Sequence, residues 1–268
     1  MIADDPHFVL RLASDDRDLA AAQRLRYAVF VEELGADGPL VDHDARLERD
    51  AFDPHVDHLL LIDTRRDPAA LDDVVGVYRL LTSDRAASVG RFYSEDEYDL
   101  SPLRASGRRL LELGRSCVHR DFRGGTAMFH LWNALADYVL DRDIEILFGV
   151  ASFHGTDPAP LAQPLSWLHH HHLAPPDLRV RVRPENAQRM DLIAPEALDR
   201  RAAMAATPAL IKAYLRLGGH VGDGAWIDRP FNTTDVCLLM DTARMSARHR
   251  DFYVRKAARP PVGGDAAP

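Results

Sequence analysis

Two short stretches of the 268-residue chain carry side chains that could do chemistry. The first is LELGRSCV, residues 111–118, where apolar and polar residues alternate as they do in a strand. Leu111, Leu113 and Cys117 would face the core, which predicts that the opposite face carries Glu112, Gly114 and Ser116. A carboxyl group that is partly buried on a covered face has a raised pKa and suits the role of a general base.

The second stretch is HRDFRGGTAMF, residues 119–129, which ends a strand and begins a helix. Backbone N–H groups at the start of a helix attract anions, so the turn at Arg123-Gly124-Gly125 is a candidate anion-binding loop. It is neither a Walker loop nor a GxGxxG turn. Taken alone, glycines at this position also occur in turns that bind nothing.

These two stretches must be positioned by a mixed α/β fold, because helical and strand patterns interleave along the chain. A helix is expected at 17–34, closed by Gly35, and others at 126–140 and 208–217. Short apolar or alternating runs predict strands at 58–62, 74–81, 110–118, 144–150, 179–183 and 236–240. The predicted architecture is therefore one mixed sheet with helices on its faces.

Composition limits the class of protein. The hydrophobic fraction of 46% is ordinary for a globular domain, and no apolar run approaches the roughly 20 residues that span a bilayer. A formal charge of −8 argues against a general nucleic-acid binder. The acidic N-terminus does not resemble a signal peptide, and two cysteines cannot build a disulfide scaffold, so we expect a cytoplasmic protein. One domain at 1–241 and a partly disordered basic tail at 242–268 are the expected organisation.

Positive charge is concentrated in two places despite the acidic total. Six arginines lie between residues 100 and 123, and the tail from 242 to 259 adds six more basic residues against one acid. Such patches are often only solvated surface. They also suit a phosphate, an acidic carrier protein or an anionic membrane surface.

Other motifs favour structural roles or exclude whole classes. The run His169–His172 precedes Pro175-Pro176, and consecutive side chains diverge too far to bind one ion, so a loop or capping role is expected and no metal site. No GxSxG elbow is present, which argues against a serine hydrolase. Arg79 lies in a predicted strand and needs a partner such as Asp50 or Asp53; a purely structural pair would explain it as well as a substrate site.

The glycine turn resembles the acyl-donor loop of GNAT acyltransferases, with Thr126 and Met128 in place of the small residues of that pattern. Upstream, RYAVFV (26–31), DAFD (50–53), VGVYRLL (75–81) and LELGRSCV follow the order seen in N-acyl-homoserine lactone synthases. The amino-acid sequence of these motifs is still more similar to that of the L-ornithine Nα-acyltransferases, which use 3-hydroxyacyl-acyl carrier protein. This resemblance covers roughly residues 8–240.

The resemblance implies a GNAT fold, with a central, mostly antiparallel twisted sheet flanked by helices. It implies N-acylation of L-ornithine by a 3-hydroxyacyl group from acyl carrier protein, giving lyso-ornithine lipid, with no metal and no bound cofactor. The catalytic candidates are Glu112, Arg79, Arg115 and Ser116. The candidates for the amino acid site are Arg26, Phe30, Asp50 and Asp53, where an aspartate would hold the side-chain ammonium. The candidates for the phosphopantetheine site are Cys117, Val118, Arg120, Arg123, Gly124, Gly125 and Thr126.

Three other functions stay open from the sequence. The same chemistry could act on another amino acid such as glutamine, or the chain could make homoserine lactones from S-adenosylmethionine. A domain of another kind would only bind acyl carrier protein or lipid without turnover. For an enzyme that makes a lysolipid, the basic tail would favour peripheral contact with the anionic inner face of the cytoplasmic membrane.

Overall fold

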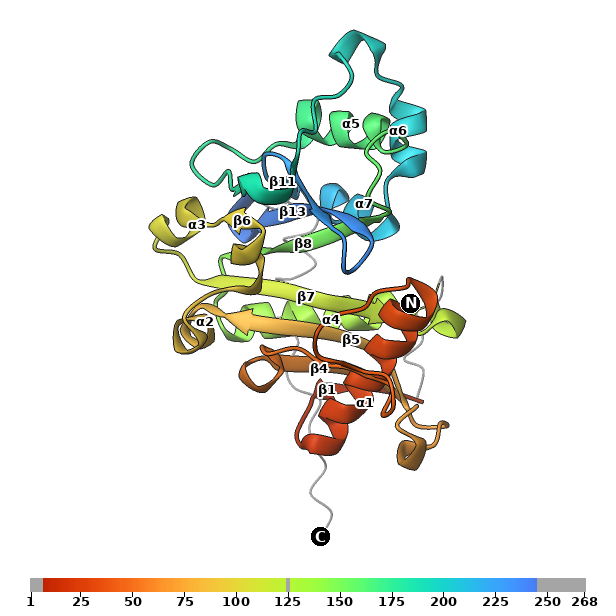
Figure 1. Ribbon diagram of the computed structural model, residues 1–268. Helices are drawn as coiled ribbons and strands as arrows, with labels where there is room; N and C mark the ends of the chain where they lie inside the picture. The colour runs from red at the N-terminus through yellow and green to blue at the C-terminus, as the bar shows by residue number, and fades with distance from the viewer. Residues whose placement is uncertain (1–6, 124–125, 245–268) are drawn as a thin grey trace.

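The computed structural model describes residues 7–123 and 126–244 (Figure 1). Gly124, Gly125 and most of the basic tail lie outside these residues. One nine-stranded sheet runs through the molecule in the order β1-β4-β5-β7-β8-β13-β12-β10, with β11 paired to β13. Its strands are β1 (Phe8–Leu12), β4 (Asp57–Asp63), β5 (Val74–Thr82), β7 (Leu110–Val118), β8 (Ile146–His154), β10 (Ala187–Gln188), β11 (His220–Val221), β12 (Ala225–Asp228) and β13 (Thr233–Asp241).

Two further two-stranded sheets pair β2 with β3 and β6 with β9. They consist of β2 (Val41–Asp42), β3 (Leu47–Glu48), β6 (Tyr98–Asp99) and β9 (Arg181–Val182). The helices are α1 (Asp16–Arg26), which continues as the π-helix η1 (Tyr27–Glu33), α2 (Ser83–Val89), α3 (Ser101–Ala105), α4 (Ala127–Asp141), α5 (Ala162–His172), α6 (Arg200–Ala206) and α7 (Ala209–Arg216). Single 3₁₀ turns are η2 (Asp53–His55), η3 (Pro68–Ala70), η4 (Tyr93–Asp96), η5 (Arg120–Phe122), η6 (Pro184–Asn186), η7 (Pro195–Ala197) and η8 (Thr242–Arg244).

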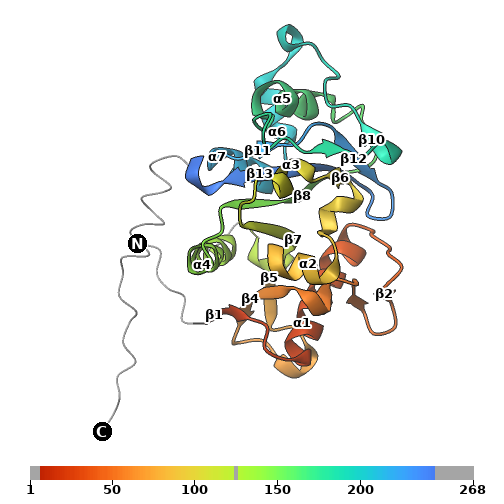
Figure 2. The same ribbon diagram turned by 90° about the vertical axis from the view of Figure 1, so that its left-hand side faces the viewer.

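Helices cover both faces of the sheet (Figure 2). On one face α4 packs against β1, β4 and β5, and α7 packs against β13. Leu131, Leu135 and Val139 form the buried side of α4, at the spacing of one helical face. On the other face α1 packs against β4, β5 and β7. Both faces of the central strands are therefore buried, which explains why β5 and β13 read as almost continuous apolar runs.

The sequence expectations for the main elements are confirmed, with three differences. The strand expected at 144–150 is observed at Ile146–His154. The strand expected at 179–183 is reduced to Arg181–Val182, which pairs with β6 instead of joining the large sheet. The strand expected at 236–240 begins earlier, at Thr233, and so includes Asp235. The expected mixed, mostly antiparallel sheet is present, because neighbouring strands in the large sheet pair antiparallel apart from β7 and β8. In the described part of the chain, no helix has both the length and the apolar character needed to cross a bilayer.

The parallel pair β7 and β8 opens partway along its length. Their ladder ends where Glu112 pairs with Phe148, although both strands continue for several residues. Gly149 follows at φ +156°, and a Cβ there would lie 2.1 Å from the carbonyl oxygen of Leu113. Only glycine lets the two backbones approach this closely at the point where they part. Beyond it, the edges of β7 and β8 face an opening instead of each other.

We predict that Gly149→Ala separates β7 from β8, because the added methyl overlaps the Leu113 oxygen. The free energy of unfolding should fall by about 1–3 kcal/mol, as measured by urea denaturation. Gly38→Ala is the matched control, since its nearest neighbour would be the Cγ2 of Val41 at 3.8 Å. Equal stability of the two variants would contradict this account of the opening.

Candidate active site

A cavity of about 260 Å³ fills the opening between β7 and β8. Glu112 and Gly114 line it from β7, and Phe148 and Ser152 line it from β8. Phe30 closes one side from the π-helix, a helix type that is often found at functional sites. The break in the ladder thus places strand residues and a helix residue around one space large enough for a small molecule.

Glu112 is buried at this cavity, with an exposed fraction of 4%. Its carboxylate accepts hydrogen bonds from the backbone N–H groups of Tyr93, at 2.8 Å, and of Ser94, at 2.7 Å, and from the Ser94 hydroxyl. Burial raises the pKa of Glu112, while the hydrogen bonds from Ser94 and Tyr93 oppose this rise. The turn η4 therefore fixes the orientation of a carboxyl group that takes up a proton more readily than an exposed glutamate.

A β-bulge next to Gly114 changes the side-chain pattern that the sequence predicts. Val77 pairs with Cys117 and Arg79 with Gly114, so two residues of β7 face Tyr78 alone. Arg115, inside the bulge, has φ +47°. The alternation is inverted beyond it: Cys117 packs in the cluster beneath α1 and not with Leu111 and Leu113, as the unbroken pattern predicts. The bulge also turns Arg115 toward the α1 side.

Arg115 belongs to a closed ring of six charges, which we call the charge ring. Going round it, each arginine contacts two acids: Arg26 contacts Glu48 and Asp53, Arg115 contacts Glu48 and Asp50, and Arg79 contacts Asp50 and Asp53. The measured separations include 2.6 Å for Arg26–Asp53, 3.2 Å for Arg115–Glu48, 3.1 Å for Arg115–Asp50 and 3.6 Å for Arg79–Asp53. Three positive and three negative groups leave the ring neutral.

The ion pairs within the charge ring limit how its members can interact with a ligand. Arg26 is completely buried, and Arg79 and Arg115 are among the residues that line the cavity. Burial by itself would raise the pKa of Asp50, but Arg79 and Arg115 lower it well below its usual range. The expected Asp50 or Asp53 partner of Arg79 is confirmed. The assignment of either aspartate to a substrate ammonium stays a prediction, and both carboxylates already have arginine partners.

A second cavity of about 640 Å³ adjoins the first. Both are lined by Phe30, Leu34, Ser116 and Leu210, so they meet beside the bulge. The rest of its wall is mostly apolar and includes Val118, Met128, Phe129 and Trp132, with Cys117 and Arg123 also contributing. Thr126 immediately precedes α4, and Gly124 and Gly125 of the expected donor loop lie outside the described residues.

The arginine-rich stretch is less positive at the surface than its sequence indicates. Five of its six arginines make ion pairs: Arg104 with Glu95, Arg108 with Asp241, Arg109 with Asp143, Arg115 in the charge ring and Arg123 with Glu33. The sixth, Arg120, is exposed on η5. Within the described residues this one side chain is the clearest remnant of the predicted basic patch.

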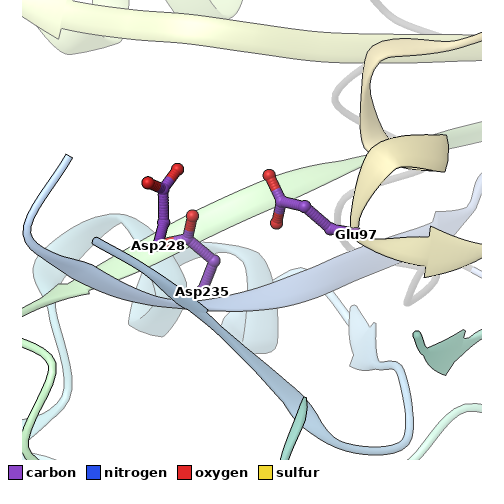
Figure 3. A group of neighbouring side chains, drawn as sticks. All are labelled: Glu97, Asp228 and Asp235. Carbon is purple, nitrogen blue, oxygen red and sulfur yellow. The ribbon is translucent and has the colours of Figure 1, made fainter. Parts of the chain in front are cut away.

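Three acids that the sequence did not single out form a cluster, which we call the acid cluster. Asp228 ends β12, Asp235 lies in β13, and Glu97 faces both from the segment between η4 and β6 (Figure 3). One oxygen of each carboxylate lies within 4.8 Å of the other two. Burial raises the pKa of Glu97 well above its usual range, and the two aspartates raise it further. Asp228 and Asp235 line the 260 Å³ cavity.

One signal in the sequence could have identified part of this cluster. Asp235 interrupts the apolar strand TTDVCLLMD, and an acid in a strand with two covered faces is rarely buried without a role. The other two acids come from distant segments, so only the fold brings them together. The histidine run, by contrast, forms the last turn of α5, where protonated side chains would interact favourably with the helix dipole.

Comparison with known proteins places this geometry in a class. Residues 25–133 match the acetyltransferase (GNAT) domain family. The structure also resembles that of a CoA-dependent acyl-homoserine lactone synthase, BjaI, with MTA: the TM-score is 0.50 at 17% identity, over 97% of this chain and 94% of that one. The sheet that opens between β7 and β8 is thus the scaffold of a GNAT acyltransferase.

Relatives at higher identity narrow the class to one family. The L-ornithine N(alpha)-acyltransferase of Rhodobacter capsulatus is 70% identical over 93% of this chain and 95% of its own length. The protein of the same name from Brucella abortus is 42% identical over 93% and 90%. The chain belongs to the L-ornithine Nα-acyltransferase family.

We predict that the charge ring is essential for stability. Arg26→Met removes the arginine that the buried carboxylates of Glu48 and Asp53 share. Because these charges lose a partner, the free energy of unfolding should fall by about 3–5 kcal/mol. Arg46→Gln removes an exposed ion pair with Glu32 and should change it by less than about 1 kcal/mol. Urea denaturation measures both, and a loss below 1 kcal/mol for Arg26→Met would show that the ring is dispensable.

Proposed function

We propose that this enzyme transfers a 3-hydroxyacyl group from the thioester of acyl carrier protein to the α-amine of L-ornithine, forming lyso-ornithine lipid. The observation that carries the proposal is the 70% identity, over nearly the whole chain, to a protein named for this acceptor. Two cavities that meet beside Ser116 supply the required arrangement, with one space for each substrate. The product would be the first intermediate of ornithine lipid synthesis.

The apolar 640 Å³ cavity is the proposed donor site. A phosphopantetheine arm and acyl chain need an elongated apolar wall, which Met128, Phe129 and Trp132 provide. Arg120, Arg123 and the loop before Thr126 are the proposed phosphate contacts, at the start of α4 where backbone N–H groups favour an anion. Thr126 and Met128 replace smaller residues of the GNAT loop, which suits the single phosphodiester of a carrier-bound arm better than the pyrophosphate of CoA.

The 260 Å³ cavity is the proposed acceptor site. Arg79 and Arg115 line it, and their remaining N–H groups suit the α-carboxylate of an amino acid. Glu112 takes a proton from the α-ammonium, directly or through water, and the neutral nitrogen then attacks the thioester carbonyl. Backbone N–H groups of residues 116–118, beyond the end of the β7–β8 ladder, are the proposed donors to the oxyanion. Collapse of the intermediate breaks the C–S bond, and the thiolate leaves without a strong acid.

The proposed product also bears on membrane contact. A lysolipid has one long apolar chain, and the basic tail expected to meet an anionic surface lies almost entirely outside the described residues. Peripheral contact through residues 242–268 therefore stays a prediction from the sequence.

The expected activity can be measured directly. The purified protein, incubated with 3-hydroxyacyl-acyl carrier protein and L-ornithine, should give a lyso-ornithine lipid of the corresponding mass. The matching 3-hydroxyacyl-CoA should react more slowly, and the reaction with the acidic carrier should weaken as salt rises. A product formed only from glutamine, or a homoserine lactone formed from S-adenosylmethionine, would replace this proposal. No product with any acceptor would favour a binding domain.

We predict two effects at the proposed base. Glu112→Gln should lower kcat by about 10²–10⁴-fold, because an amide cannot accept the proton. Ser94→Ala removes a hydrogen bond that stabilises the charged carboxylate, so the pKa of Glu112 should rise, and the acidic limb of the kcat profile should move to higher pH. Ser88→Ala, which removes an exposed hydroxyl that donates to the Asp84 carbonyl on α2, is the matched control. Near-normal kcat for Glu112→Gln at all pH values would exclude the base role.

A further inference from the structure

The acid cluster has no part in the reaction as described so far. It nevertheless borders the acceptor cavity, because Asp228 and Asp235 line the same space as Arg79, Arg115 and Glu112. In the ladder Trp226 pairs with Asp235 and Asp228 with Thr233, which places both aspartates on one face of the β12–β13 pair. The Tyr98 hydroxyl donates to the backbone oxygen of Asp235, at 2.9 Å, and so holds the neighbouring Glu97 against this face.

The carboxylates of this wall are only partly satisfied within the described protein: the Phe231 N–H donates to Asp228 Oδ1 at 3.0 Å, and hydrogen bonds from Ser152 and Thr233 act on Asp235. Asp235 and Glu97 are 3% and 4% exposed, yet Oδ1 of the first and Oε2 of the second have no hydrogen-bond partner there. Buried carboxylate oxygens without partners are costly, so these two, facing the half-buried Asp228, would gain from a cationic ligand.

Among residues 7–123 and 126–244, no lysine or arginine makes an ion pair with the acid cluster. Burial raises the pKa of Asp228 and Asp235, and the charge of Arg115 opposes this rise only in part. Its ion pairs, however, are with Glu48 and Asp50, and its guanidinium group stacks over the rings of Tyr93 and Phe231 at 4.8 Å. Since the charge ring is neutral as a whole, it holds no spare positive charge to balance the acid cluster when its members ionise.

We propose that Glu97, Asp228 and Asp235 bind the side-chain ammonium of the acceptor amino acid and so determine specificity for a basic substrate. This inference rests on the proposed function and names the residues that recognise the acceptor amino acid. An ammonium group has three N–H donors, which matches three carboxylates around one point. With its α-carboxylate on Arg79 and Arg115, a diamino acid would extend along the cavity and bring its second amine to the acid cluster.

The arrangement also explains why a neutral acceptor would be rejected. An amino acid without the second amine would fill the cavity but leave the buried carboxylates unpaired. Sites built to pair with a polar group discriminate strongly against analogues that lack it. Glutamine presents a neutral amide with only two N–H donors, and it would place a carbonyl oxygen beside three acids. The cluster therefore favours ornithine over the glutamine alternative.

The test compares L-ornithine with L-norvaline, which has the same carbon chain without the second amine. The wild-type kcat/KM should favour ornithine by about 100-fold or more. In Asp235→Asn and in Glu97→Gln this ratio should fall at least tenfold, chiefly because KM for ornithine rises. Asp191→Asn, which removes an exposed acid on another segment, should keep the wild-type ratio. Titration calorimetry of ornithine with each protein gives the same comparison without turnover.

Each result decides between distinct explanations. If a variant loses activity equally with ornithine and norvaline, the cluster is structural and the inference is wrong. If Asp235→Asn does not fold, Asp228→Asn at the end of β12 provides the same ratio. A preference for ornithine that disappears in EDTA and returns with Mg²⁺, Mn²⁺ or Ca²⁺ would assign the carboxylates to a metal and overturn the proposal. If the wild-type protein acylates norvaline or glutamine but not ornithine, the proposed function itself is wrong.

Discussion

Six buried charges of alternating sign beneath α1 stabilise the part of the structure that borders the 260 Å³ cavity. The charge ring joins the end of a helix, the loop around β3 and η2, and two central strands, β5 and β7. A single buried arginine would be expensive to desolvate, but each member here has two partners of opposite sign. The ring also fixes the bulge in β7, because Arg115 can reach Glu48 and Asp50 only when the bulge turns it toward α1. The opening between β7 and β8 begins just before that bulge, where their ladder ends at Glu112.

The 260 Å³ cavity, the proposed acceptor site, combines two kinds of charge with opposite energetics. The ring is already compensated, so its arginines can touch a ligand while their positions stay fixed. The acid cluster is not compensated, and burial raises the pKa of all three of its members. A charged group that already has a partner of opposite charge can position a substrate. A charged group without such a partner gains the most free energy when the substrate binds. Stability is thus given up at one end of the cavity where binding can recover it.

Much of the fold could be predicted from local patterns, because the central strands and α4 bury continuous or regularly spaced apolar residues. Glu112 could be placed on its face by alternation alone, since the alternation is intact up to Gly114. The bulge could not be predicted, because its signal is a positive φ at Arg115, a residue that rarely adopts it. Cys117 was therefore assigned to the wrong face. The strand at 179–183 alternates well, but the backbone of Val182 bonds to Asp223 and leaves only a two-residue pair with β6.

Some residues of the candidate site could likewise be predicted from the sequence, and others could not. Residues within one motif, such as Glu112 and Arg115, could be found from the sequence because their spacing is local. The acid cluster could not, since Glu97, Asp228 and Asp235 are brought together only by the pairing of β12 with β13 and the contact of Tyr98 with Asp235. Likewise, the pairing of Arg79 with Asp50 or Asp53 could be expected from the sequence, but only the structure reveals that Arg26 and Arg115 share these aspartates as well.

The unequal volumes of the two cavities have a consequence for how the product leaves the enzyme. A space of about 260 Å³ holds an amino acid but not a fatty chain, whereas the adjoining 640 Å³ is mostly apolar. In the proposed reaction the new amide therefore straddles the junction, with its headgroup on one side and its tail on the other. The tail blocks the passage for a second donor until the lipid departs. Exit of the amphiphile, rather than bond formation, is thus the step that a detergent or bilayer would accelerate.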